Sequence, residues 1–232
     1  MTDKIIGFFI GAGGGLDQPT ASIKLLEDRL VLKTFDARPD AEGISPVCFW
    51  SSPGPRWFYE NRTRQSSSLL PAEPEALDYI QENGLPWRSE AELVRMVEVE
   101  TETLDGYCQK ASLWPEFLSM DIQGAEYEVL KAAPRALEHL LAIITEVEFR
   151  QIYQGQKLFA DIDTLLRAAK FQFMSLYVPQ YWRLHPGDTQ RVLTVGEALF
   201  LRKPEGLDEA VLSKLAAIAR CFGFEGYTQA GE

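Results

Sequence analysis

The strongest constraint on the fold is a continuous apolar run, Ile5-Ile6-Gly7-Phe8-Phe9-Ile10, that ends directly in the glycine cluster Gly11-Ala12-Gly13-Gly14-Gly15. A strand that is apolar at every position is buried on both faces, as in a parallel sheet. The glycines indicate a sharp exit from this strand. A weakly helical stretch over residues 20–29 and a second apolar run, Leu30–Phe35, which ends at Asp36, complete a βαβ unit. This unit predicts a parallel sheet with a right-handed crossover.

Strand-like and helix-like segments alternate along the rest of the chain, apart from an irregular region at about 50–96. In and around that region we expect strands at Val47–Trp50 and Trp57–Tyr59 and helices at Glu73–Glu82 and Ser89–Arg95. Further strands are expected at Val97–Thr101, Phe117–Asp121, Leu141–Phe149, Phe171–Val178 and Ala198–Leu201, and further helices at Leu104–Lys110, Ala125–Ala132, Arg135–His139, Phe159–Ala169 and Leu207–Ala219. This order predicts one Rossmann-like α/β domain over residues 1–232, with a C-terminal helix at about 207–221.

Length, charge and cysteine content exclude several classes of protein. The 232 residues suffice for one well-buried core, and a net charge of -11 opposes binding to nucleic acid. The three cysteines form no C-x-x-C pair, which argues against a zinc site or a disulfide framework and favours reduced thiols. No stretch reaches the roughly 18 apolar residues of a membrane span. We therefore expect a cytoplasmic protein, and the sequence leaves homo-oligomerisation open.

The glycine cluster has the spacing of a nucleotide-binding turn. Gly11, Gly13 and Gly15 alternate after the first strand, and Asp36 closes the next strand, where an acid accepts hydrogen bonds from ribose hydroxyls. A dinucleotide fingerprint, G-x-G-x-x-G, needs glycine where this chain has Leu16. The spacing G-x-G-x-G is instead that of enzymes that use S-adenosylmethionine. The alternative is a glycine-rich turn without a ligand, and the acid at the expected distance argues against it.

A second segment, Phe117–Glu126, reads as a strand, a tight turn and the start of a helix. Asp121 falls at the carboxyl end of a central strand, where open α/β sheets bind their ligands. Gly124 permits the turn, and the charge of Glu126 in the first helical turn suits the helix dipole. On these residues alone, helix capping by the two carboxylates is the preferred interpretation, because such caps are common.

An ordered set of motifs resembles the FkbM family of S-adenosylmethionine-dependent methyltransferases. The segment Met120-Asp121-Ile122-Gln123-Gly124-Ala125-Glu126, with Val129-Leu130, resembles the family signature K-I-D-V-(E/Q)-G-A-E-x-x-V-L. Further motifs in family order are Phe35-Asp36-Ala37-Arg38-Pro39, Ser67-Ser68-Leu69-Leu70-Pro71, Thr101-Glu102-Thr103-Leu104-Asp105, Glu146-Val147-Glu148-Phe149 with Tyr153-Gln154-Gly155, and Glu197-Ala198-Leu199-Phe200. The resemblance covers nearly the whole chain.

The resemblance implies a mostly parallel seven-stranded sheet of the class I methyltransferase type, with the irregular 50–96 segment as an insertion. It implies transfer of a methyl group from S-adenosylmethionine to a hydroxyl oxygen of a sugar, glycan or natural product. Expected catalytic residues are Asp121, Glu148 and Tyr153. Expected cofactor-binding residues are Gly11, Ala12, Gly13, Gly15, Asp36, Ala37 and Ser52. Ser67, Ser68 and Glu126 are expected on the acceptor side.

Two long segments, the insertion and the loop 178–191, leave carboxyl ends of strands and are therefore expected to contact the acceptor. The loop carries Trp182, expected to bind the acceptor, and His185, which is either a catalytic base or a solvated loop histidine. The aromatic residues of the insertion are equally consistent with acceptor contacts and with core packing. With two histidines in the chain, a metal centre would have to be built from carboxylates, and none is expected.

Three departures from the family pattern concern the cofactor side. Phe9 stands where the family usually has an acid, Met120 where lysine is common, and Ser52 where an acid follows the third strand. Asp36 is therefore the clearest cofactor anchor. Two rival interpretations remain: a catalytically weak methyltransferase-like binding module, and an NAD-dependent oxidoreductase, which Leu16 disfavours.

Overall fold

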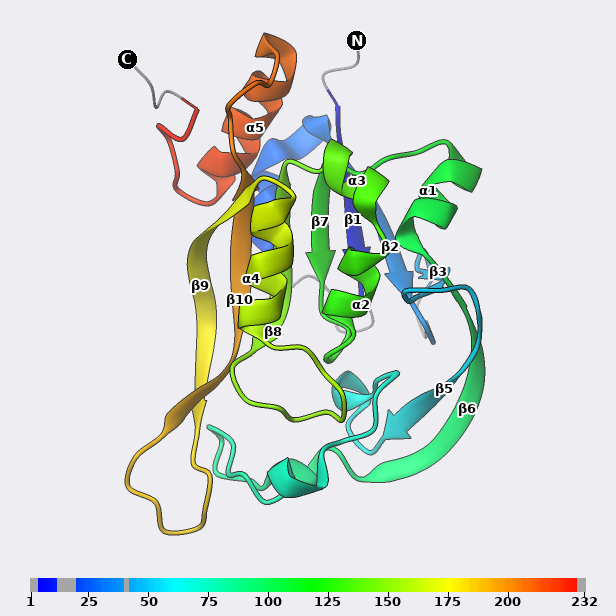
Figure 1. Cartoon of the computed structure of the whole chain (residues 1–232), viewed down its shortest axis with the longest axis vertical. Coiled ribbons are helices and arrows are strands. Elements are labelled where there is room, and N and C mark those ends of the chain that lie inside the picture. Colours follow the sequence, from blue (N-terminus) through cyan, green and yellow to red (C-terminus); the bar gives the residue numbers. More distant parts are fainter. Residues whose placement is uncertain (1–3, 12–19, 40–41, 229–232) are drawn as a thin grey trace.

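A computed structural model describes residues 4–11, 20–39 and 42–228 of the chain, and a large sheet lies at its centre. Within these ranges it has seven strands in the order β3-β2-β1-β7-β8-β10-β9. They are β1 (Ile5–Ile10), β2 (Leu30–Asp36), β3 (Ser45–Pro46), β7 (Phe117–Met120), β8 (Ala142–Glu148), β9 (Phe171–Trp182) and β10 (Val192–Arg202). Among these described strands only β10 runs against its neighbours. The expected mostly parallel seven-stranded sheet is confirmed (Figure 1).

Helices cover both faces of this sheet (Figure 1). One face carries α1 (Leu104–Ala111), α2 (Glu126–Lys131), α3 (Pro134–His139) and α4 (Phe159–Ala168). The other carries η2 (Thr20–Arg29) and α5 (Glu209–Cys221). The helix expected at 20–29 is present but has 3₁₀ geometry, and it breaks at Glu27, whose φ of 48° is not helical.

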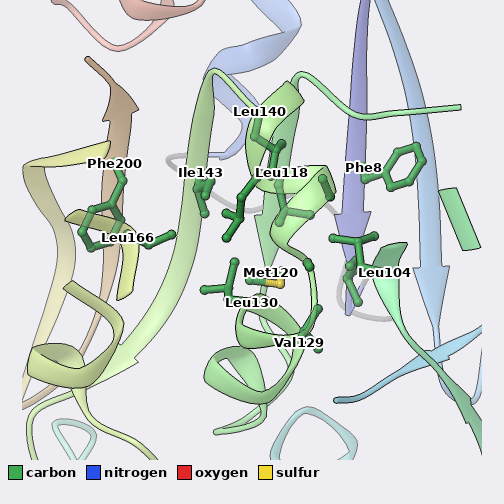
Figure 2. Packing of buried hydrophobic residues seen from close by; sticks show 14 of the residues in the cluster. Phe8, Leu104, Leu118, Met120, Val129, Leu130, Leu140, Ile143, Leu166 and Phe200 are labelled. Atoms are coloured by element: carbon green, nitrogen blue, oxygen red, sulfur yellow. The ribbon is translucent and has the colours of Figure 1, made fainter. Parts of the chain in front are cut away.

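An apolar layer fills the space on each side of the sheet, because successive side chains of a strand point to opposite faces. Leu118 and Met120 of β7 are fully buried against Val129 and Leu130 of α2, as Figure 2 shows. Phe117, on the opposite face of β7, packs in the layer of η2 and α5. Burial on both faces explains why the central strands are apolar at nearly every position.

The insertion forms a second sheet of three strands within the described residues, in the order β4-β6-β5. These strands are β4 (Cys48–Phe49), β5 (Gly54–Asn61) and β6 (Leu93–Glu102), and single 3₁₀ turns lie at η3 (Arg64–Ser66), η4 (Pro74–Ala76) and η5 (Trp87–Ser89). The insertion and its sheet lie beyond the carboxyl edge of the main sheet (Figure 1).

Several expected boundaries are wrong in this region. The strand expected at Val47–Trp50 is reduced to β4 in the second sheet, and β3 of the main sheet ends just before it, at Pro46. The helix expected at Glu73–Glu82 is reduced to a single 3₁₀ turn. The helix expected at Ser89–Arg95 gives way to β6, because antiparallel pairing with β5 outweighs the local helical preference.

The carboxyl ends of β1, β2, β7 and β8 meet at one edge of the main sheet (Figure 1). The chain continues from β1 to β2 on one side, whereas β7 leads to β8 on the other. Such a switch in direction leaves a crevice between the outgoing loops, which is where open α/β sheets bind ligands. None of the described helices is long and apolar enough to cross a membrane.

Candidate functional site

The crevice is formed by a close approach of two backbones at the carboxyl ends of β1 and β7. Gly11 has a φ of 91°, and a Cβ atom there would lie 1.8 Å from the carbonyl oxygen of Asp121. The Asp121 amide in turn donates to the carbonyl of Ile10 at 3.1 Å. Only glycine fits this position, because a side chain would meet backbone atoms that cannot move aside cheaply.

A cavity of about 430 Å³ opens beside this contact. Its wall includes residues that follow β1, β2 and β7, namely Gly11, Asp36, Ala37 and Asp121, together with Phe49, Phe58 and Ser67 from the insertion. Its volume is in the range of sites for small organic ligands, and its wall combines apolar faces with a few polar groups, as such sites do. The predicted cofactor residues Gly11, Asp36 and Ala37 and the predicted acceptor residue Ser67 therefore line one cavity.

Arginines hold the carboxylate of Asp36 at one end of the cavity. Asp36 Oδ1 accepts the Arg38 amide at 2.7 Å and lies 3.6 Å from the guanidinium of Arg64. Arg64 also donates to the Arg38 carbonyl, and Arg38 pairs with Glu60 at 2.8 Å. A ligand that bonds to Asp36 would therefore meet a carboxylate already oriented by its neighbours.

Gln123 joins the turn after β7 to the other strands. Its side-chain amide donates to Asp121 Oδ1 and to Glu146 Oε2, each at 2.7 Å. Its carbonyl oxygen accepts the hydroxyl of the fully buried Tyr153 at 2.8 Å, and that hydroxyl also lies 2.9 Å from the Ser66 carbonyl. The adjacent Gly124 has a φ of 92°, which disfavours any side chain, and a Cβ there would also lie 2.9 Å from the Gln156 amide. The turn therefore connects β7, β8 and the insertion.

Several carboxylates gather where β7, β8 and β10 meet. One carboxylate oxygen each from Asp121, Glu146 and Glu197 lies within 4.8 Å of the others. Burial, together with the charge of Asp121, raises the pKa of Glu146 well above its usual range. Burial and the charge of Glu126 do the same for the pKa of Glu148. Burial also raises the pKa of Glu126 to about 8, although its carboxylate accepts the Ile122 amide at 2.8 Å.

Four other predicted site residues that the structure describes are not part of the cavity wall. Ser68 is buried and its hydroxyl donates to the Gln123 carbonyl at 2.7 Å, and the Ser52 carbonyl accepts the Thr101 hydroxyl at 2.9 Å. β9 extends to Trp182, so this residue is part of a strand, and its indole packs 5.6 Å from that of Trp87. His185 is exposed in the turn beyond β9, where its amide donates to Asp188 at 2.8 Å. Ala12, Gly13 and Gly15 lie outside the described residues.

The aromatic residues of the insertion have mixed roles. Trp50 and Trp87 are buried, Phe58 lines the cavity, and Trp57 is 53% exposed. Trp87 also packs edge-to-face on Tyr153, with ring centroids 5.8 Å apart. Core packing is therefore confirmed for Trp50 and Trp87, and contact of the insertion's aromatic residues with the acceptor stays a prediction.

Sequence reasoning missed two carboxylates of the cluster and the glutamine whose amide donates to it. Glu146 lies two residues before Glu148, and strand alternation places both side chains on one face of β8. Glu197 pairs directly with Glu146 across the antiparallel β8 and β10. Gln123, within the signature, has a φ of 58° and turns its amide toward these acids. Strand periodicity could have identified Glu146, whereas the register that brings Glu197 alongside is visible only in the folded chain.

The arrangement offers two chemical environments next to each other. The Gly11–Asp36 end has a bare backbone turn and an oriented carboxylate, which suit a nucleoside. The end at Asp121 leads to a buried acidic region, which suits proton transfer or a cation. Cys48, on the wall near Asp36, has its pKa raised to about 12 by burial, so it is a neutral thiol. All three cysteines are unpaired.

Comparison with known proteins gives two matches. Residues 58–173, half of the chain, match the methyltransferase FkbM domain. The chain is also similar to the 2-O-methyltransferase NoeI of Sinorhizobium fredii (strain NBRC 101917 / NGR234), with 36% identity over 61 residues. This alignment covers 26% of the chain and 25% of NoeI, so the chain spans about a quarter of the length of that relative.

Proposed function

The chain belongs to the FkbM methyltransferase family, and on that premise we propose that it transfers a methyl group from S-adenosylmethionine to a hydroxyl oxygen of a sugar, glycan or natural product. The observation that carries the proposal is the cavity between Gly11, Asp36 and Asp121 at the switch point of the sheet. The partial likeness to a 2-O-methyltransferase supports oxygen as the accepting atom.

The residues present fit the donor. The surface of Gly11 is bare backbone, so an amino-acid or nucleoside group could approach it closely. Asp36 ends β2, the position from which an acid accepts ribose hydroxyls, and its carboxylate is already held by the Arg38 amide. The apolar rings of Phe49 and Phe58 are in the same wall and suit the flat face of a purine.

In this proposal Asp121 serves the acceptor hydroxyl. S-Adenosylmethionine supplies a methyl group on a sulfonium, which an oxygen attacks from the side opposite the sulfur. The chain has to orient that oxygen and take its proton as the new C–O bond forms and the C–S bond breaks. Asp121 lines the cavity, and the Gln123 amide fixes its carboxylate at 2.7 Å. We assign Asp121 as the general base and Glu148 and Tyr153 as residues that support it from the buried side of the site.

Calorimetry with S-adenosylmethionine and with NAD tests the donor. Binding of S-adenosylmethionine alone is expected, and Asp36→Ala should weaken it by about 1.5–3 kcal/mol, the range for a hydrogen bond to a charged group. The control is Asp78→Ala, which removes an aspartate that is also paired with an arginine but lies on the surface. Binding of NAD alone would indicate an oxidoreductase. Binding of neither compound would indicate a methyltransferase-like binding module.

A further inference from the structure

The carboxylates of Asp121, Glu146 and Glu197 come from three different strands or strand ends and converge on one point. One oxygen of each lies within 4.8 Å of the others. β10 runs antiparallel to β8 in a register that sets Glu197 opposite Glu146, so both side chains project from the same face. Asp121 follows β7, the neighbour of β8 on its other side. Three half-buried acids thus share a small space.

An independent observation at the same place is the side chain of Glu148. It is 0% exposed, and neither carboxylate oxygen has a hydrogen-bond partner among the described residues. It projects from the same face of β8 as Glu146, two residues away. The Gln156 amide is near enough to lower the pKa of Glu148, yet its nitrogen also lacks hydrogen-bond geometry with any described residue. Buried polar groups without partners are rare, and binding of an ion is one of the roles that explain them.

We propose that Asp121, Glu146 and Glu197 bind one divalent metal ion of the Mg²⁺ or Mn²⁺ type, with Glu148 as a further carboxylate at its rear. Hard divalent cations take carboxylate oxygens as ligands and keep part of their water shell, which matches a half-buried, all-oxygen site. This revises the expectation that the protein has no metal centre. The inference goes beyond the proposed function and does not depend on it.

The place of the ion gives it a role in that function. Asp121 is shared between the metal cluster and the cavity wall, so the ion would lie beside the acceptor. A sugar hydroxyl that replaces one of its waters would be oriented and made more acidic, because a bound cation stabilises the alkoxide. Gln123, whose amide already engages one oxygen of Asp121 and one of Glu146, would hold these two ligands in place.

Mn²⁺ titration of the purified full chain, followed by the electron paramagnetic resonance signal of free Mn²⁺, tests the site. One ion should bind per chain, Mg²⁺ should displace it, and Glu146→Gln and Glu197→Gln should each weaken binding by at least about tenfold. Glu98→Gln makes the same charge change at an exposed position of β6 and should leave binding unchanged. Mg²⁺ should also raise the unfolding temperature of the unaltered protein and not that of Glu197→Gln.

Two results would overturn the proposal: no saturable Mn²⁺ binding at millimolar concentrations, or equal Mn²⁺ affinity in the unaltered protein and both variants. If Glu146→Gln does not fold, Glu197→Gln alone decides, because Glu197 is only partly buried and lies on the opposite face of β10 from Ala198, which packs in the layer of α2. No methyl donor is present in this titration. Its failure is therefore separable from failure of the donor-binding test, which uses calorimetry without added metal.

Discussion

Gly11 and Gly124 show how single residues without side chains create the candidate site. Both have positive φ, at 91° and 92°, and in both a Cβ atom would collide with a neighbouring group. At Gly11 the neighbour is the backbone of Asp121, whereas at Gly124 it is the end of the Gln156 side chain, which can move. Gly11 is therefore the less replaceable of the two.

Replacement of Gly11 should damage both stability and donor binding. Gly11→Ala should lower the free energy of unfolding by more than about 2 kcal/mol, because the contact with the Asp121 carbonyl adds to the backbone strain of about 1–2 kcal/mol. The control is Gly84→Ala, with a φ of 85° and nothing within 4 Å, which should cost the strain alone. Urea unfolding measures both. Equal losses would show that the two strands can separate at this point.

Residues of the site differ in how far the sequence reveals them. Asp36 and Asp121 could be identified because each stands at the carboxyl end of a strand, and such positions converge in a parallel sheet. Trp182 is expected in a loop, whereas β9 continues past its apolar run and places this residue in a buried contact with Trp87. Glu197 could not be predicted as a site residue from the sequence, because its partner across the sheet, Glu146, is distant in the chain.

Among the secondary-structure elements, α1 and α3 are connected by one carboxylate. Thr103 caps α1 by accepting the Gly106 amide at 3.0 Å. Asp105, within the first turn of α1, accepts the amides of Arg135 and Ala136 at 3.0 and 2.7 Å. α3 has no cap of its own, since the residue at that position is Ala133. Asp105 thus supplies the cap of a helix 30 residues further along the chain.

Loss of Asp105 should therefore destabilise α3 and its contact with α1. Asp105→Ala should lower the free energy of unfolding by about 2 kcal/mol, because two backbone amides lose a charged acceptor. Asp208→Ala removes the cap of α5, a single bond to the Val211 amide at 2.9 Å, and should cost about 1 kcal/mol. Urea unfolding curves give the comparison. If the Asp105 variant loses no more than the Asp208 variant, α3 does not need this contact.

The elements that sequence reasoning located well are those whose burial is visible in the local sequence, either as a continuous apolar run or as a single apolar stripe. β1, β7 and β8 are apolar runs, and α5 has a single apolar stripe, so local sequence specifies each. The expected helix Ser89–Arg95 overlaps the start of β6. The first residues of β6, from Leu93 to Met96, are exposed, so they lack the alternation of buried and exposed side chains that predicts a strand. Their strand conformation comes from pairing with β5, a contact more than 30 residues away in the chain.

At the scale of the whole molecule, Tyr153 connects the insertion to the main sheet. Its ring is fully buried, and its hydroxyl lies within hydrogen-bond distance of the Ser66 carbonyl in the insertion and of the Gln123 side chain after β7. The Ser68 hydroxyl makes a second link, to the Gln123 carbonyl. The wall of the cavity that the insertion contributes is therefore held by a few buried polar contacts.

Removal of the Tyr153 hydroxyl should loosen the insertion while the sheet remains intact. Tyr153→Phe should lower the free energy of unfolding by about 1–3 kcal/mol, because buried acceptors lose their donor. Hydrogen exchange followed by mass spectrometry should show faster exchange over residues 61–68 and unchanged exchange in β7. In the control Tyr227→Phe, which removes a hydroxyl 3.0 Å from the Arg202 carbonyl, exchange over 61–68 should not change. Equal exchange in both variants would contradict the link.

The antiparallel course of β10 makes the chemistry of the site sensitive to small changes in the length of the chain. A shift of β10 by two residues past β8 would keep every apolar side chain on its proper face. The same shift would place Val195 or Leu199 opposite Glu146 and withdraw Glu197 from the acidic cluster. Insertions and deletions in the turn between β9 and β10 therefore preserve the chemistry only where they leave this pairing unshifted, and homologues that differ in the length of this turn are candidates for altered chemistry on an unaltered fold.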